Sequence, residues 1–177
     1  NYIVFGAYGT GNRPIISCAN QSGKYAIYTI GSRWQYVILQ DLEFRGGLEL
    51  WSYSGSMHHV KVLRCYVDGT GAVNGTINFF RNPTNEPAPE VWTFEGNGDI
   101  SDIEIAYCTV INSDYDGIFV SASGNLWIHH NEIYNAGEDG IDLQGSNNLM
   151  EHNVVSQTNA TGIQNMPQYG GGANNTI

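Results

Sequence analysis

The chain is poor in charged residues, and above all in positively charged ones. Only 14% of its 177 residues are charged, and 7 Lys and Arg stand against 17 Asp and Glu, for a net charge of −10. Nucleic acids and anionic membranes are bound through Lys and Arg, so neither is an expected partner. The composition still allows an acidic polysaccharide as a partner, provided that a local cluster of cations or a bound Ca²⁺ supplies positive charge.

Long apolar runs and a leader segment are also missing. No run approaches the roughly 20 apolar residues of a membrane span, so no span is expected. Residues 1–5 have the pattern of a strand interior and not that of a signal peptide. Residues 170–177 have the pattern of a turn that is cut short. We therefore expect the sequence to be a fragment of a longer repeat protein.

What the chain does contain is an internal repeat. Five segments each have an apolar residue followed three positions later by Asp, Cys or Asn, at the anchor positions Asp41, Cys65, Cys108, Asn131 and Asn153. The anchors are separated by 24, 43, 23 and 22 residues. In four segments a second apolar residue follows two positions after the anchor, and Asp41 is the exception. Short strands at this period, without a helical pattern, predict an all-β solenoid with one coil per repeat.

Stacked coils place equivalent residues in columns, about 4.8 Å apart. The repeat predicts a ladder between the side-chain amides of Asn131 and Asn153. It also predicts two inward apolar columns, which are Ile38, Val62, Ile105, Ile128 and Met150, and Val67, Val110, Ile133 and Val155. The one long interval between anchors predicts a Pro-rich loop at about residues 81–98, inserted in a single domain of residues 1–177.

Cysteine is scarce, with three residues in the chain. Cys65 and Cys108 fall at equivalent positions of consecutive coils, close enough for a disulfide. Two buried free thiols fit the same positions, because Cys packs well as a small apolar group, and we favour this interpretation. Cys18 has no obvious partner, and the absence of a C-x-x-C motif argues against a structural metal site of that type.

Residues between the inward positions are expected to face outward. The outward stripe contains Arg64, Tyr107, His129, His130, Glu132, Glu151 and His152. Such a cluster of imidazoles and carboxylates could bind a transition metal or serve as acid and base. The alternative is that exposed positions beside a ladder simply take polar residues. The neighbouring pair His58 and His59 lies at a turn and carries less weight.

Acidic turns form a second candidate site. Asp116 and Asp139 lie in equivalent turns, with Asp142 just beyond on the following strand. Like charges about 5 Å apart repel each other unless a cation lies between them or one is protonated. Clustered carboxylates are ligands that Ca²⁺ prefers, so one interpretation is a calcium site. The other is that Asp-Gly is a favourable turn dipeptide whose charge is screened by solvent.

The columns, together with the segment FGAYGTGNRPII at residues 5–16, resemble the secreted bacterial β-helix proteins of the pectate-lyase-like superfamily. Similar proteins include alginate lyases, chondroitinase-B-like lyases and mannuronan-epimerase-like repeats. The resemblance implies a right-handed, single-stranded parallel β-helix with coils of about 22–24 residues, and a secreted or cell-surface location. It is more specific for fold than for activity, because the repeat reflects stacking and not chemistry.

The resemblance implies a lyase-like activity, which requires a cation for the uronate carboxylate, a base and an acid. Residues 100–177 contain no Lys or Arg, and no catalytic motif of the family matches, so catalysis stays open. The candidate catalytic residues are Lys61, Arg64, Tyr107, His130 and His152. The candidate substrate-binding residues are Trp92, Trp127, His129, Glu132 and Glu151, and the candidate calcium ligands are Asp116, Asp139 and Asp142.

Two functions compete at this point. The first is an extracellular carbohydrate-associated domain that binds or cleaves an acidic polysaccharide. The second is a non-catalytic structural, adhesion or fibre-forming solenoid, whose open coil ends pair with neighbouring copies end to end. The resemblance to the superfamily favours the first function, and the lack of Lys and Arg in the later coils argues against it.

Overall fold

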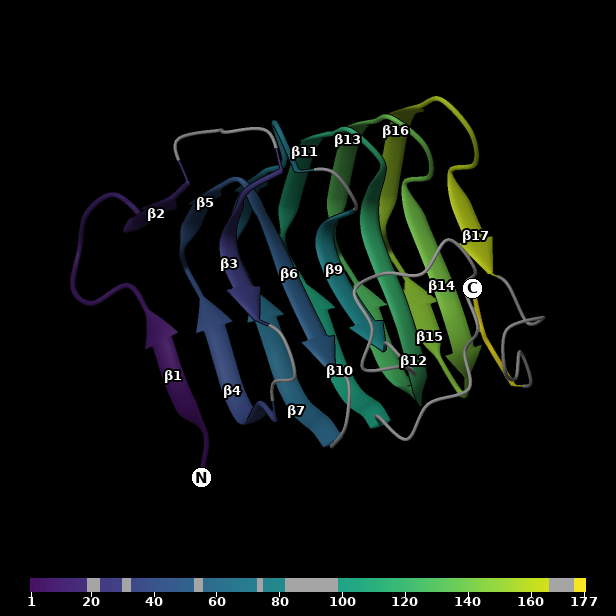
Figure 1. The fold of residues 1–177 in the computed structure, drawn as a ribbon, viewed down its shortest axis with the longest axis horizontal. Coiled ribbons are helices and arrows are strands. Elements are labelled where there is room, and N and C mark those ends of the chain that lie inside the picture. The colour runs from purple at the N-terminus through teal and green to yellow at the C-terminus, as the bar shows by residue number, and fades with distance from the viewer. Residues whose placement is uncertain (19–22, 30–32, 53–55, 73–74, 82–98, 166–173) are drawn as a thin grey trace.

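The computed structural model describes residues 1–18, 23–29, 33–52, 56–72, 75–81, 99–165 and 174–177. Within these residues every regular element is a β-strand, which confirms the all-β class. The strands form a stack of coils, and each complete coil contributes three strands (Figure 1). The described part of the chain has no helix that is long and apolar enough to cross a membrane.

Three faces run along the stack (Figure 1). The first face contains β1 (Ile3–Gly6), β4 (Gln35–Gln40), β7 (Ser56–Leu63), β10 (Asp99–Ala106), the second half of β12 (Asp116–His129) and β15 (Leu149–Glu151). The second face contains β2 (Ile15–Ser17), β5 (Glu43–Arg45), β8 (Tyr66–Asp68), β11 (Thr109–Ser113), β13 (Glu132–Ala136) and β16 (Val154–Thr158). The third face contains β3 (Tyr25–Thr29), β6 (Gly47–Ser52), β9 (Gly75–Arg81), the first half of β12, β14 (Ile141–Ser146) and β17 (Ile163–Asn165).

All pairings between these strands are parallel, as a single-chain winding requires. Strand β12 turns the corner from the third face to the first without a break. Its register shifts between Ser121 and Gly124, and Gly124 has a φ of 151°, a conformation that glycine adopts without steric cost. The protein is therefore a parallel β-helix, as predicted.

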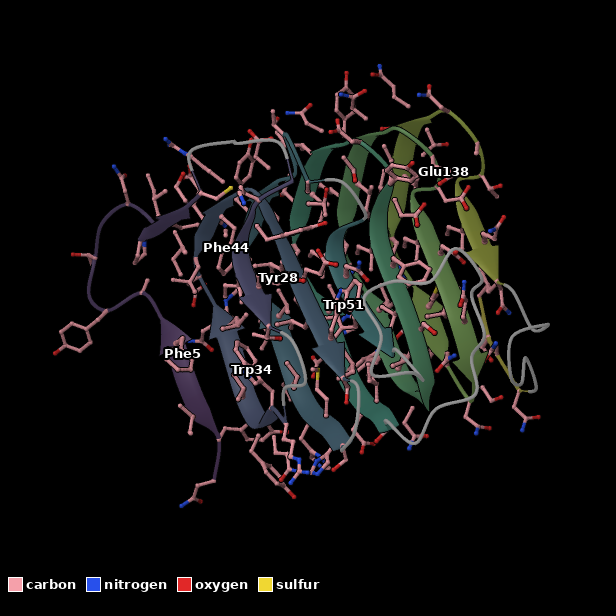
Figure 2. All side chains as sticks on the ribbon, viewed as in Figure 1. Phe5, Tyr28, Trp34, Phe44, Trp51 and Glu138 are labelled. Atoms are coloured by element: carbon pink, nitrogen blue, oxygen red, sulfur yellow. The ribbon has the colours of Figure 1, made fainter. Side chains whose placement is uncertain are left out.

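The predicted inward columns are confirmed with one correction. Val62, Ile105, Ile128 and Met150 stack in register, and so do Val67, Val110, Ile133 and Val155. Phe44 extends the second column into the interior (Figure 2). The prediction of Ile38 was wrong, because Leu39 pairs with Val62 while Ile38 pairs with Lys61 on the outside.

The same one-residue shift corrects the first anchor. Glu43 pairs with Tyr66, so Leu42 and not Asp41 is the equivalent of Cys65. A slip of one residue moves a strand's side chains to the opposite side, and Asp41 accordingly lies outside, bonded to Arg64. The irregular apolar spacing around Asp41 was the sequence signal of this error.

The predicted asparagine ladder is confirmed. The side-chain amide of Asn131 donates to Asn153 Oδ1 at 3.0 Å, and Asn131 Oδ1 accepts the backbone N–H of Cys108 at 3.0 Å. A second ladder, which the sequence interpretation missed, stands at another corner. Asn148 Oδ1 accepts the N–H of Leu126 at 3.1 Å, and Asn175 Oδ1 accepts the N–H of Asn148 at 3.0 Å. Both ladders join consecutive coils by satisfying backbone donors at their corners.

The corners have a common backbone conformation. Among the described residues, fourteen non-glycine residues have a positive φ, and the strand register places all of them in three columns. The columns are Tyr36, His59, Asp102, Asn125, Asn147 and Asn174; Asp41, Arg64, Tyr107, His130 and His152; and Asn112, Asn135 and Gln157. Much of the predicted outward stripe therefore consists of corner residues in the left-handed region, where Asn, Asp and His are favoured.

The three cysteines are free thiols, as favoured from the sequence. Cys65 and Cys108 are buried, and their sulfurs lie 3.4 and 3.3 Å from the carbonyl oxygens of Leu63 and Ala106. The loop expected at about residues 81–98 lies, apart from Arg81, outside the described residues.

Candidate functional site

The first face presents a group of interacting side chains on its outer surface. Strand alternation turns Ile105, Ile128 and Met150 inward, so their neighbours on either side project outward. The resulting group, called here the histidine–aromatic cluster, consists of Glu104, Tyr107, Trp127, His129, His130, Glu151 and His152. Strands β10, β12 and β15 and the corner that follows them position it.

Trp127 is held in a fixed orientation within this cluster. Its indole stacks on the imidazole of His129, with ring centroids 3.9 Å apart and an interplanar angle of 26°. Its Nε1 donates to Glu151 Oε1 at 3.0 Å. Trp127 is nevertheless 42% exposed, whereas His129, beside it, is only 4% exposed. A large, oriented aromatic surface therefore faces solvent.

His129 and His130 share a hydrogen bond. Their Nδ1 atoms lie 3.0 Å apart, and His129 Nε2 lies 3.4 Å from Glu104 Oε1. A carboxylate only accepts, so the proton of a neutral His129 belongs on Nε2, and its Nδ1 accepts from Nδ1–H of His130. The two facing nitrogens hold one proton between them. The pair can therefore give or take a proton in an acid–base step.

The exposed rings form a stack along the corner. Tyr107 stacks on His130 with centroids 4.8 Å apart, and His130 lies 4.8 Å from His152. This spacing matches the separation of neighbouring strands. The outermost ring, His152, also has its Nε2 3.9 Å from Glu151 Oε2.

The structure brings together most of the residues predicted for this face. Tyr107, Trp127, His129, His130, Glu151 and His152 all belong to the cluster. Lys61 joins it through Glu104, whose Oε2 accepts from Lys61 Nζ at 2.6 Å. This hydrogen bond raises the pKa of Lys61. The sequence interpretation missed Glu104, although it stands one coil before Trp127 in the same outward column.

Of the remaining predicted residues, Arg64 is next to Tyr107 in the same corner column, one coil earlier, and Glu132 lies on another face. Arg64 forms a two-pronged contact with Asp41, with its Nε and one terminal nitrogen each 2.8 Å from a carboxylate oxygen. The Arg64 side chain lowers the pKa of Asp41. Glu132 lies on β13 of the second face, in register with Thr109 and Val154. Trp92 falls outside the described residues.

The acidic turns form a ladder of their own. Asp116 Oδ1 accepts the backbone N–H of Asp139 at 3.1 Å, and Asp139 Oδ1 accepts the N–H of Thr161 at 2.7 Å. Burial raises the pKa of Asp116 to about 7. Burial, reinforced by the negative charge of Asp139, raises the pKa of Asp142 to about 6. Repulsion between these carboxylates is thus relieved in part by protonation.

Asp142 belongs to a set of buried polar residues on the outer side of the third face, called here the polar wall: Glu49, Asn78, Asp142 and Gln144. Phe119 stands between Asn78 and Asp142 in their column, and Gln144 belongs to the neighbouring column. The inward residues of the same strands, such as Ile141 and Leu143, are fully buried as well. Among the described residues, no donor reaches Asn78 Oδ1, Asp142 Oδ1 or Gln144 Oε1. Buried acceptors and raised carboxyl pKa values are features that occur often at functional sites.

Metal coordination was predicted for the acidic turns. Over the part of the chain that the structure describes, no three His, Cys, Asp or Glu side chains are already arranged as a metal cage. One oxygen of Asp116 and one of Asp139 are engaged by backbone N–H groups of the next coil. These contacts use one oxygen of each carboxylate, and calcium binding stays a prediction.

Comparison with known proteins identifies the family. Residues 46–177, about three quarters of the chain, match the family described as right handed beta helix region. No curated protein and no solved structure gives a significant match. The matched segment contains strands β6 to β17 and thus the histidine–aromatic cluster. The parallel coils and this match agree, and the chain belongs to the right-handed β-helix family.

Proposed function

We propose that this chain is an extracellular carbohydrate-binding domain that takes an acidic polysaccharide across the histidine–aromatic cluster. The observation that carries the proposal is the orientation of Trp127, which is fixed by His129 and Glu151 yet remains largely exposed. A preoriented ring loses little conformational freedom on binding and offers an apolar surface to the C–H face of a sugar. Nearby carboxylates and imidazoles supply hydrogen-bond partners for hydroxyl groups.

The proposal that the glycan is acidic is supported by the N–H donors of Lys61 and Arg64 that their ion pairs do not use. Lys61 has three N–H donors and Arg64 has five. Glu104 accepts from Lys61, and Asp41 accepts from two nitrogens of Arg64. Both cations are partly exposed, with 32% and 47% of their side-chain surfaces accessible. A uronate carboxylate has donors to bind at both without displacing the existing partners.

Cleavage is a second candidate function, and the raised pKa values of Asp116 and Asp142 favour it. A carboxylic acid that keeps its proton near neutral pH is suited to protonate a leaving oxygen. On the first face, the His129 and His130 pair offers the matching ability to accept a proton. Turnover of a bound glycan at either place would make the chain an enzyme, whereas binding alone would make it a recognition module.

The experiment compares binding of alginate, pectate, chondroitin sulfate and a neutral glucan by calorimetry, with absorbance of unsaturated product followed in parallel. We expect Trp127→Ala to weaken binding of the preferred acidic glycan at least tenfold, about 1.4 kcal/mol. The matched control is Tyr134→Ala, because Tyr134 is 46% exposed but lies on the second face. Equal binding by Trp127→Ala and the parent chain would contradict the proposed site. Absence of binding to every glycan would favour a structural solenoid.

A further inference from the structure

One arrangement of side chains occurs twice on the first face, at two different corners. A tyrosine stands 23 residues before the second histidine of a His-His pair, at Tyr36 with His58 and His59, and at Tyr107 with His129 and His130. The tyrosine packs against the second histidine, with centroids 4.6 Å apart in one case and 4.8 Å in the other. It meets the first histidine edge-on, at 5.5 and 5.4 Å.

The two copies also share their backbone conformation and a contact between imidazole nitrogens. The second histidine of each pair is a left-handed corner residue, with φ of 56° at His59 and 54° at His130. This conformation turns its ring back toward the preceding histidine. The Nδ1 atoms then face each other at 2.8 Å for His58 and His59, and at 3.0 Å for His129 and His130.

The two copies differ in where a carboxylate stands. In the second copy, Glu104 approaches Nε2 of His129, on the far side of the ring from the shared Nδ1 contact. In the first copy, Asp102 Oδ2 lies 3.6 Å from Nδ1 of His59, the same atom that faces His58. Two imidazole nitrogens and one carboxylate oxygen therefore gather on one side of the first copy.

The contact of Asp102 with His59 in the first copy fits a pair of metal ligands better than a hydrogen bond. A nitrogen–oxygen separation of 3.6 Å is too long for a good hydrogen bond. Ligands about 2.0–2.1 Å from a tetrahedral Zn²⁺ are themselves about 3.3 Å apart. The separations of 2.8 and 3.6 Å bracket that value. The opposite end of Asp102 is held by Asn125, whose Nδ2 donates to Oδ1 at 3.3 Å, as supporting hydrogen bonds often hold a metal-ligating carboxylate.

We propose that His58, His59 and Asp102 bind one borderline divalent transition-metal cation, such as Zn²⁺ or Ni²⁺, with water completing the coordination. Two imidazoles and a carboxylate are a donor set that these ions prefer and that Ca²⁺ does not. Within the described residues no three such side chains place their donor atoms around one metal position as they stand, so the proposal requires the Asp102 carboxylate to turn toward the two imidazoles. His59 and Asp102 have 39% and 41% of their side-chain surfaces exposed, which leaves the ion a path and the carboxylate room to move.

The second copy lacks these properties. His129 is 4% exposed, and His130 lies between the rings of Tyr107 and His152. Its carboxylate also sits on the wrong nitrogen for joint coordination. The second pair is therefore an internal control with the same dipeptide, the same corner conformation and a similar tyrosine contact.

The test is calorimetric titration of the chain, prepared without a histidine tag, with ZnCl₂ and separately with NiCl₂. We expect one ion per chain, and at least tenfold weaker binding in His58→Ala and in Asp102→Asn. Asp102→Asn keeps a residue that tolerates the left-handed conformation, so loss of the fold does not explain its effect.

The matched control is His130→Asn, which removes a histidine from the second pair at an equivalent backbone conformation. It is expected to leave zinc and nickel affinity unchanged. Undiminished binding in both His58→Ala and Asp102→Asn would overturn the proposal, and so would an equal loss in His130→Asn. Absence of any binding by the parent chain would overturn it as well. Titration with CaCl₂ is expected to give the same heat in the parent chain and in Asp102→Asn.

Discussion

Glu104 on the first face and Asp142 on the third face are both outward carboxylates on central strands, yet their surroundings differ. Glu104 is joined to Lys61 at 2.6 Å and approached by His129 at 3.4 Å. Asp142 is 4% exposed, and its hydrogen-bond donors are amides such as Gln144 Nε2, at 3.4 Å. On the first face a cation compensates the charge, and on the third face burial raises the pKa of the Asp142 carboxyl to about 6, so that it holds its proton at mildly acidic pH.

The difference shows that the packing of the coil interior does not determine which side chains occupy its outer surface. Ile105 on the first face and Ile141 on the third are equally and fully buried. The outer side of the first face carries several interacting exposed rings, whereas the outer side of the third face carries the buried polar wall, with Tyr28 exposed in the coil before Glu49 (Figure 2). The groups proposed to bind glycan and the carboxyls with raised pKa values thus lie on two different faces of one scaffold.

The largest expected effect concerns the glycines at the start of the strands of the third face. Its strands begin beside glycines, and a Cβ at Gly140 would collide with Val155 Cγ1 and with the carbonyl oxygen of Gly162, the latter at 2.5 Å. We expect Gly140→Ala to lower the free energy of unfolding by about 2–3 kcal/mol, because the backbone of the next coil must move. Thermal or urea denaturation measures this effect.

Gly162 is the matched control, one coil later at the equivalent position. A Cβ there meets nothing within 4 Å, so Gly162→Ala should be nearly neutral. Equal destabilisation by the two substitutions would show that close coil packing is not what requires glycine at the start of this face.

The next effect is the pH dependence of stability that the third face confers. The pKa values of Asp116 and Asp142 are raised from 3.8 to about 7 and about 6. Between pH 4 and 7 the folded chain therefore binds more protons than the unfolded chain at these two sites. Their contribution to stability is complete below about pH 4 and is lost as the pH rises through about 7. We expect the thermal midpoint to fall by several degrees between pH 5 and pH 8.

Asp142→Asn separates this effect from other titrations. The amide cannot ionise, so the fall in midpoint between pH 5 and pH 8 should become shallower in this variant. Glu104→Gln on the first face should leave that fall largely unchanged. A parent chain whose midpoint is constant over this range would contradict the interpretation of the polar wall.

The repeat allowed the fold and the interior to be predicted because coil stacking imposes one period on every column. The Asn131 and Asn153 ladder and the column ending at Met150 followed from spacing alone. The first coil was misaligned by one residue because Ile38 and Leu39 are both apolar, and the spacing rule did not separate them. Only cross-strand register, which depends on the neighbouring coil, decides that Leu39 faces inward.

The candidate sites could be predicted only in part. Spacing placed His129 beside Glu151 and His130 beside His152 in outward columns, because register follows from the period. It did not predict that His129 would be covered, since that depends on the ring orientation of Trp127. It also missed the polar wall, because burial of an outward residue such as Asp142 depends on the surroundings of the coil and not on its period.

A smaller effect tests the charge compensation on the first face. Glu104→Gln weakens the contacts to Lys61 and His129, and we expect a loss of about 1 kcal/mol in the free energy of unfolding. Glu132→Gln on the second face is the control and should change stability by less than about 0.5 kcal/mol. An effect of Glu104→Gln no larger than that of the control would mean that the ion pair adds nothing to the first face.

The smallest expected effect on stability comes from His152, and it separates structure from function within the histidine–aromatic cluster. The His152 side chain is 67% exposed at the outer end of the ring stack, and its φ of 55° suits asparagine. We therefore expect His152→Asn to change the free energy of unfolding by less than about 0.5 kcal/mol. If the cluster binds glycan as proposed, the same variant should bind the preferred glycan measurably more weakly, because the cluster loses the exposed ring next to His130. Unchanged glycan affinity with unchanged stability would confine recognition to Trp127 and its immediate neighbours. A large loss of stability would instead show that the ring stack holds the coils together.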